Sequence, residues 1–288
     1  MKLIEEAWAS GSKCAAGSDI KGFFTRIPKA QVIDFLREAV PDSAFVELTE
    51  KALTVELQNA SQMSAEDLHL FPTGPDGVAQ GCPLSALAGN IVLRDFDRLL
   101  NDPSRGVVCI RYIDDFIILG RKGDHVRKAM AVARAHLKAL GMDIYDHETE
   151  PGKAFFCPLA DGPEFLGHTL VRGKYPPAKA AQEKLQKTVL ALIQNGKGAI
   201  GKALSGETLK SSDKPFAATV LAINNTLKGW RGSFRSSNCP ETFEAIDTWV
   251  HQQLGNFQEY LRTHASGKTA KLRAAALGVA TVASATID

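Results

Sequence analysis

Two adjacent aspartates, Asp114 and Asp115, lie between short apolar runs in the segment VVCIRYIDDFIILG, residues 107–120. The β-branched residues on either side predict the two strands of a tight hairpin. Asp is a poor strand former, and neighbouring carboxylates raise each other's cost of ionisation, so the pair is unfavourable unless a cation neutralises it. Mg²⁺ prefers carboxylate oxygens and keeps coordination positions open for phosphates. The alternative is an acidic surface turn, but such a turn does not need apolar strands on both sides.

The same segment carries a resemblance to a known family. Tyr112 and Ile113 complete a YIDD sequence that resembles the YxDD box of reverse transcriptases. Three further boxes of that family occur in the family's order: DIKGFF at 19–24 (motif A), FLG at 165–167 (motif E) and, between them, motif B. Motif B, QGxPLSxxLxN, is matched at Gln80, Gly81, Pro83, Ser85 and Asn90. The chain is thus similar to reverse transcriptases of the bacterial group II intron and retron-like type.

The resemblance implies a two-metal centre. It assigns Asp19, Asp114 and Asp115 as catalytic metal ligands and places Ile20, next to Asp19, in the same metal site. Two cations held roughly 4 Å apart require more carboxylates than one hairpin turn supplies, so a further carboxylate such as that of Asp19 is needed. We expect two Mg²⁺ ions, for which Mn²⁺ can substitute.

The resemblance also implies a nucleotide site made of Phe24, Gln80, Gly81 and Tyr112. Phe24, five positions after Asp19, corresponds to the aromatic residue that excludes a ribose 2′-hydroxyl and so favours deoxynucleotides. Gly81 allows the backbone to approach a nucleotide or template base closely, and the amide of Gln80 can reach the sugar or base. Buried core packing is the alternative for either phenylalanine, and we expect it for Phe23.

The chain departs from the family pattern in motif D, where a Lys-Thr pair is usual. The aligned pair here is Glu148-Thr149, and Lys153 follows four to five residues later. Lys153 is therefore the candidate proton donor to the departing pyrophosphate, an effect of order 10²–10⁴-fold, or the role is empty. Motif E implies a primer-grip hairpin at Phe165, Leu166 and Gly167, while a strand with a glycine bulge is the structural alternative.

Helices and strands must position these residues. Apolar spacing predicts helices over 2–10, from Pro28 to about Val40, 46–58, after Pro83, 124–140, 178–194, 215–234 and 240–263. Pro176-Pro177 marks a linker. We therefore predict an α+β fold, with a palm of antiparallel sheet and flanking helices followed by an all-helical thumb. The predicted domains are residues 1–171 and 172–288.

Charge is divided unequally along the chain. Residues 1–167 carry 18 Lys and Arg against 24 Asp and Glu, whereas residues 168–288 carry 16 against 8, a net charge of −6 and of +8. This asymmetry suggests an acidic metal-holding half and a basic phosphate-holding half, although a solvated basic face is the alternative. INNTLKGWRGSF, residues 223–234, resembles the thumb module of group II intron maturases. That resemblance implies phosphate contacts by Lys228, Arg231 and Arg235, and helix-bundle packing by Trp230 and Trp249.

Composition adds weaker constraints. The 288 residues are 44% hydrophobic, enough for a sizeable core. The five scattered cysteines (Cys14, Cys82, Cys109, Cys157 and Cys239) form no CxxC pair, which favours reduced, mostly buried thiols in a cytoplasmic protein. No signal peptide or membrane-spanning apolar run is recognisable, so we expect no membrane partner. The Ala- and Gly-rich residues after Leu272 predict a frayed helix end.

The implied reaction is the addition of dNTPs to the 3′ end of a DNA or RNA primer on an RNA template. Two other functions stay open: a non-catalytic, maturase-like RNA-binding protein, and a defence-type polymerase that works without a template. Clustered carboxylates without a metal are costly, which argues against the first. Only eighteen residues precede Asp19, whereas the family places a basic fingers region there. We therefore expect a split or truncated enzyme whose fingers come from a second polypeptide or from sequence lost upstream, with apolar surface exposed near Trp8 and Phe23. The chain by itself should then bind nucleic acid but polymerise poorly or not at all. In a minimal polymerase, Lys21, Arg26 or Lys29 would bind the triphosphate instead.

Overall fold

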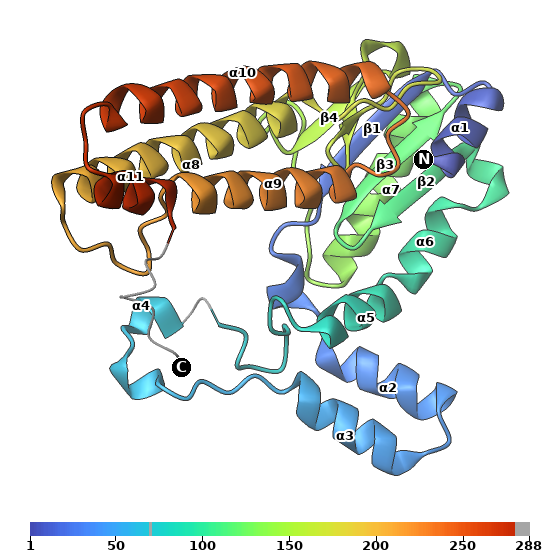
Figure 1. Ribbon diagram of the computed structural model, residues 1–288. Coiled ribbons are helices and arrows are strands. Elements are labelled where there is room, and N and C mark those ends of the chain that lie inside the picture. Colours follow the sequence, from blue (N-terminus) through green and yellow to red (C-terminus); the bar gives the residue numbers. More distant parts are fainter. Residues whose placement is uncertain (69–70, 280–288) are drawn as a thin grey trace. The chain divides into compact units, whose positions relative to one another are not determined.

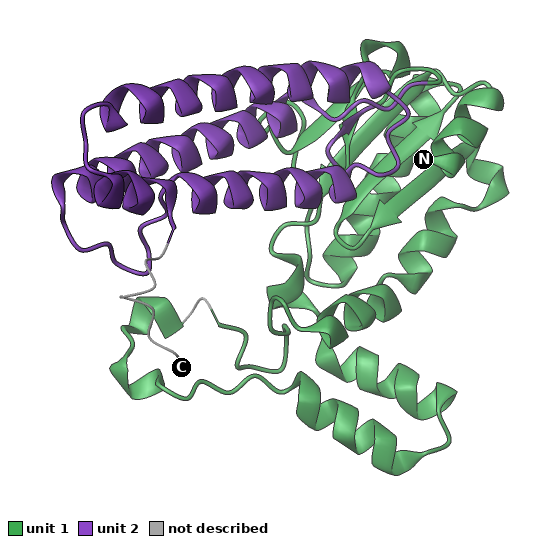
Figure 2. Cartoon of the chain, viewed as in Figure 1, with its two compact units in different colours: residues 1–166, 170–173 green, residues 167–169, 174–288 purple. Residues whose placement is uncertain are grey.

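The computed structural model describes residues 1–68 and 71–279, which form two compact units (Figures 1 and 2). Residues 1–166 and 170–173 make up unit 1, and residues 167–169 and 174–288 make up unit 2. The predicted α+β fold is confirmed, because a mixed unit built on an antiparallel sheet is followed by a unit dominated by helices.

Unit 1 is built on a four-stranded antiparallel sheet in the order β2-β3-β1-β4. The strands are β1 (Cys14–Asp19), β2 (Val107–Tyr112), β3 (Asp115–Gly120) and β4 (Ala154–Pro158). β2 and β3 form the predicted hairpin, with Tyr112 opposite Asp115. β3 is central and its residues 116–119 are fully buried, which explains the run of large apolar side chains there.

Strand β1 lies between β3 and β4 and consists of small residues for a packing reason. A Cβ atom on Gly17 would lie 2.5 Å from the ring of Phe155, its partner on β4. α7 (Gly123–Ala139) packs against β1 and β3 and buries Val126, Ala129, Ala133 and Leu137. The sheet is therefore closely covered, and the residues that can do chemistry lie at the ends of its strands.

The other helices of unit 1 are α1 (Lys2–Ala9), α2 (Lys29–Ala39), α3 (Ser43–Leu53), α4 (Ala65–Leu68), α5 (Pro83–Val92) and α6 (Arg94–Leu100). Single 3₁₀ turns occur at Phe23–Arg26, Ala60–Gln62, Pro103–Arg105 and Leu159–Asp161. α5 begins at Pro83, as motif B predicts. α3 begins three residues before the predicted start, because Asp42 caps its first turn by accepting a hydrogen bond from the Phe45 amide. It ends five residues before the predicted end.

The packing of Phe23 in unit 1 follows the sequence prediction for this residue. Its side chain is only 2% exposed, and the exposed apolar surface expected near Trp8 and Phe23 stays a prediction. Its ring fills the space over Gly89 of α5, where an added Cβ would lie 2.6 Å away. Phe23 is therefore a core residue, as its alternative interpretation held, and Trp8 is half-buried.

Unit 2 consists mainly of α8 (Lys179–Ser205), α9 (Phe216–Ser233), α10 (Pro240–Ala265) and the short α11 (Ala270–Leu277). α8 runs eleven residues beyond its predicted end at residue 194, because Gly196 is not a stop signal. It lets α8 approach Thr219 and Phe257 closely. Trp230 and Trp249 are partly buried and pack against the helical core, which confirms their predicted role.

Four shorter findings complete the fold. β5 (Glu164–Phe165) belongs to unit 1 and β6 (His168–Thr169) to unit 2, so the boundary between units runs through motif E. All five cysteines are free, but only Cys109 and Cys239 are fully buried, so the prediction of mostly buried thiols is wrong for the other three. Within the described residues no helix is long and apolar enough to cross a membrane. Most of the predicted frayed end lies outside the described residues.

Candidate functional site

Three aspartates meet at one end of the sheet of unit 1. Asp19 is the last residue of β1, and Asp115, the first residue of β3, is its partner in the antiparallel register. Asp114 lies in the two-residue turn between β2 and β3. The Ile20 amide donates to the Asp114 carbonyl oxygen at 3.1 Å, which joins the end of β1 to the turn. Residues 95 positions apart in the chain are thus brought together, as motif A and the YxDD box predict.

The electrostatics of these carboxylates are unusual. Burial raises the pKa of Asp115 to about 7, and the negative charges of Asp19 and Asp114 add to the effect. A hydrogen bond from the backbone of Leu166 to Asp115 acts in the opposite direction. Burial also raises the pKa of Asp114. The negative charge of Asp19 raises this pKa further, and the positive charge of Lys153 lowers it. These effects require the three carboxylates to lie near one another in a partly desolvated place.

Lys153 is beside the first of these aspartates. Its Nζ lies 3.5 Å from Asp19 Oδ2, and its carbonyl oxygen accepts from the Asp19 amide at 3.4 Å. Although Lys153 comes later in the sequence than the family's motif D lysine, the structure brings it to the site. Its role as the proton donor stays a prediction.

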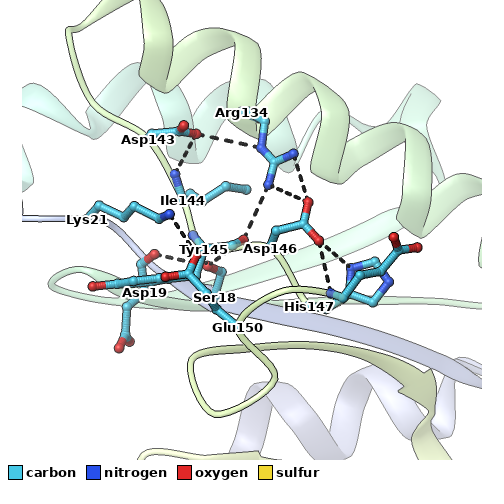
Figure 3. Close-up of polar contacts among 11 residues, drawn as sticks. Ser18, Asp19, Lys21, Arg134, Asp143, Ile144, Tyr145, Asp146, His147 and Glu150 are labelled. Carbon is cyan, nitrogen blue, oxygen red and sulfur yellow. Dashed lines mark hydrogen bonds and ion pairs between the residues drawn. The ribbon is translucent and has the colours of Figure 1, made fainter.

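A polar network around Asp19 was missed by sequence reasoning (Figure 3). Lys21 Nζ pairs with Glu150 Oε2 at 2.7 Å, and the Tyr145 amide donates to Ser18 Oγ at 3.0 Å. Arg134 of α7 pairs with Asp146 at 3.2 Å. The segment 143–150 is therefore fastened both to β1 and to α7. No signal in the sequence pairs Lys21 with Glu150, because the two residues are 129 positions apart.

The three aspartates can be compared with the ligand set that a divalent cation requires. In the described part of the chain, no three His, Cys, Asp or Glu side chains are arranged as a ready cluster for a metal ion. The chemistry of the three aspartates fits nonetheless. All are carboxylates, the ligands that Mg²⁺ prefers, and a cation would relieve the repulsion among them.

Comparison with known proteins identifies the family. Residues 4–170 match the family described as reverse transcriptase (RNA-dependent DNA polymerase). The chain belongs to the reverse transcriptase family. Residues 202–274 match the group II intron, maturase-specific domain. A comparison with curated proteins found no match.

Solved structures were also compared. Among those that match are the telomerase of Candida tropicalis and that of Candida albicans, each in complex with a TWJ fragment of telomeric RNA. The sequence identities are 12% and 11%, and the TM-scores are 0.43 and 0.40. The matches cover 96% and 95% of this chain but 50% and 48% of the telomerase chains. The chain thus spans about half the length of these proteins.

The predicted nucleotide residues occupy three segments. Phe24 is half-buried, and its carbonyl oxygen accepts from the Val78 amide at 2.7 Å, two residues before Gln80. Gln80 and Gly81 are exposed, and Gly81 has φ of +84°, a conformation that favours glycine. Tyr112 is 60% exposed beside Asp115. Their roles in binding a nucleotide stay predictions.

Motif E reaches the aspartates through its backbone. Phe165 is buried at 3% exposure, and Leu166 is exposed with φ of +49°, which is rare for a residue with a side chain. This conformation accompanies the hydrogen bond from Leu166 to Asp115. Gly167, with φ of +72°, belongs to unit 2, where an added Cβ would lie 3.4 Å from the Phe234 ring. Sequence reasoning missed the link from Leu166 to Asp115.

The predicted phosphate-binding residues lie at the end of α9 in unit 2. Lys228, Arg231 and Arg235 are all exposed. Arg231 Nη1 donates to the Phe234 carbonyl oxygen at 3.0 Å, and its guanidinium lies 4.2 Å from the centre of the Phe243 ring. Arg231 therefore has a packing role in addition to the predicted one.

Proposed function

We propose that the chain is an RNA-directed DNA polymerase that adds dNTPs to the 3′ end of a DNA or RNA primer on an RNA template. The observation that carries the proposal is the meeting of Asp19, Asp114 and Asp115 at one end of the sheet in a member of the reverse transcriptase family. Such a cluster is costly in a metal-free protein and useful in a nucleotidyltransferase.

Asp19, Asp114 and Asp115 would hold two Mg²⁺ ions, with Ile20 beside them. When bound, the ions supply Lewis-acid activation of the primer hydroxyl and stabilise the charge of the departing pyrophosphate. Lys153 is the proton donor to that leaving group. Its position 3.5 Å from Asp19 supports this role, because the ammonium group lies at the site where a triphosphate would meet the aspartates.

The chain's other site residues select and hold the substrates. Phe24 excludes a ribose 2′-hydroxyl, and Gln80, Gly81 and Tyr112 contact the incoming nucleotide or its template base. Phe165, Leu166 and Gly167 hold the primer end. In this proposal residues 1–171 form the palm and residues 172–288 the thumb, whose Lys228, Arg231 and Arg235 bind phosphates of the template–primer duplex.

A second function has its own support. The match of residues 202–274 to a maturase-specific domain favours binding of intron RNA, with or without polymerisation. In a maturase without polymerase activity, the aspartates would be dispensable for RNA binding and splicing.

Primer extension distinguishes these functions. The purified chain is assayed with Mg²⁺ and dNTPs on a defined RNA template, on a DNA template of the same sequence, and without template. Extension on the RNA template supports the proposal, and equal extension without template indicates an untemplated polymerase. RNA binding without extension on any template, even with Mn²⁺, would be the result expected of the maturase function and also of a split enzyme that lacks its fingers.

A further inference from the structure

The turn that carries the aspartates has an unfavourable backbone conformation. Ile113, its first residue, has φ of +60°. A two-residue hairpin turn with positive φ at its first position normally has glycine there. A β-branched residue in this region is an outlier that persists only where its surroundings hold it. Two backbone carbonyls of the turn are held: Asp114 by the Ile20 amide and Ile113 by Arg111.

Arg111, the fifth residue of β2, reaches back over the turn with a nearly buried side chain. Its exposed fraction is 7%. Nη1 donates to the Ile113 carbonyl oxygen at 2.7 Å and to Asn90 Oδ1 at 3.1 Å. One guanidinium nitrogen therefore joins the turn to α5, the helix of motif B.

The other side of the guanidinium is fixed by Asp97 of α6. Nε donates to Asp97 Oδ1 at 2.7 Å and Nη2 to Oδ2 at 2.5 Å. A bidentate pair of this kind fixes orientation as well as distance, and a lysine cannot reproduce it. The planar group thus has four hydrogen bonds, three of which orient it so that the fourth meets the Ile113 carbonyl.

We propose that Arg111 is a positioning residue that locks the turn and thereby sets the placement of Asp114 and Asp115 for divalent cations. The inference rests on the proposed function, since it assigns the turn to a metal centre. The charge of Arg111 is neutralised by Asp97, so Arg111 acts on the aspartates by fixing the position of the turn and not by its charge. The outside charges that act on Asp114 come from Asp19 and Lys153 instead.

Arg111→Lys tests the proposal, with Arg105→Lys as its matched control. Arg105 precedes the other end of β2, is half-buried, and also donates to a backbone carbonyl, from Nε to Leu99 at 2.6 Å. Two quantities are measured on the full chain: hydrogen exchange of residues 112–116 by mass spectrometry, and Mn²⁺ affinity by electron paramagnetic resonance.

Arg111→Lys should speed exchange in residues 112–116 and weaken Mn²⁺ binding by about 10- to 100-fold, the range for loss of an outer partner of a metal ligand. Arg105→Lys should change neither quantity, even if it lowers the melting temperature equally. If Arg111→Lys does not fold, Asp97→Asn replaces it and should shift both quantities in the same direction.

The proposal is overturned if the folded variant keeps parental exchange in the turn, or if faster exchange leaves Mn²⁺ affinity unchanged. Failure of the proposed function has a different signature. In that case the parent protein binds no Mn²⁺ at all, and faster exchange in the variant then shows a structural clamp without a metal-positioning role, which also rejects the proposal.

Discussion

The turn between β2 and β3 and the basic end of α9 are the two regions to which the proposal assigns chemistry, and they are built differently. In the turn, Arg111 and the Ile20 amide hold successive backbone carbonyls, and burial raises the pKa of Asp115 to about 7. At the end of α9, Lys228, Arg231 and Arg235 are exposed.

The difference follows from what each region is proposed to bind. Metal ions and reacting oxygens require carboxylates at fixed positions, so fixed geometry is needed even at a cost in stability. A duplex backbone offers repeated charges that exposed cations can meet in many registers without reading sequence. Substitutions in the turn should therefore change the reaction rate sharply, whereas substitutions on α9 should change affinity gradually.

The largest effect is expected from the turn. Asp114→Ala and Asp115→Ala should each lower nucleotide incorporation by more than about 100-fold, because losing a metal ligand exceeds the loss of an outer partner. Primer extension under Mg²⁺ measures the rate, and duplex affinity should stay at the parental value. Near-parental extension by either variant would show that the metal assignment is wrong.

A smaller effect is expected from α9. Reversing the charges of Lys228, Arg231 and Arg235 to Glu should weaken duplex binding by about tenfold or more and flatten its dependence on salt. Each lost phosphate contact should reduce the slope of log affinity against log salt by about 0.9.

Lys268, Lys271 and Arg273 provide the control for this prediction. They are exposed cations elsewhere in the same unit, so their reversal to Glu changes net charge equally. Equal slopes for the two triple variants would place the duplex elsewhere or show that only net charge matters.

The third effect concerns sugar choice. Phe24→Val should raise ribonucleotide incorporation relative to deoxynucleotide by about tenfold, a typical value for reshaping an apolar contact in a pocket. A competition assay with one ribonucleotide and its deoxynucleotide measures the ratio. Phe23→Val is the control, because Phe23 is buried against Gly89 and should affect stability alone. If both variants leave the ratio at the parental value, Phe24 is a core residue too.

Features whose signal is local could be predicted from the sequence. The apolar runs around Asp114 and Asp115 indicated the hairpin, and Pro83 indicated the start of α5, because strand and helix signals lie within a few residues. The family could be predicted as well, because its motifs are short runs of neighbouring residues that occur in a fixed order along the chain.

Contacts between distant segments were not predictable in this way. Lys21 with Glu150, Arg111 with Asp97, and the Leu166 backbone with Asp115 depend on how separate elements meet. The packing of Phe23 on Gly89 and the continuation of α8 past Gly196 have the same cause. Each depends on a glycine that lets another segment approach, and the sequence shows the glycine but not its neighbour.

The smallest expected effect is a change in stability when alanine replaces a glycine that has free space around it. Gly229 is exposed in the interior of α9, and a Cβ there would meet no atom within 4 Å. Gly229→Ala should therefore stabilise the protein by about 0.5–1 kcal/mol, because glycine loses more backbone entropy in a helix than alanine. Thermal unfolding should show a rise of about 1–4 °C.

Gly196→Ala on α8 should have the opposite sign, since its Cβ would lie 2.5 Å from Thr219 Oγ1 and 2.9 Å from the Phe257 ring. Overpacking of this kind typically costs about 1–3 kcal/mol.

A stabilised Gly229→Ala variant with weaker duplex binding would mean that the face of α9 around Gly229 lies against the phosphate backbone, because an added methyl group then obstructs the contact. Stabilisation with unchanged binding would limit the duplex contact to the long side chains of Lys228, Arg231 and Arg235. Destabilisation would mean that the backbone at Gly229 is not helical in solution. The conclusion that this face of α9 is open would then be wrong.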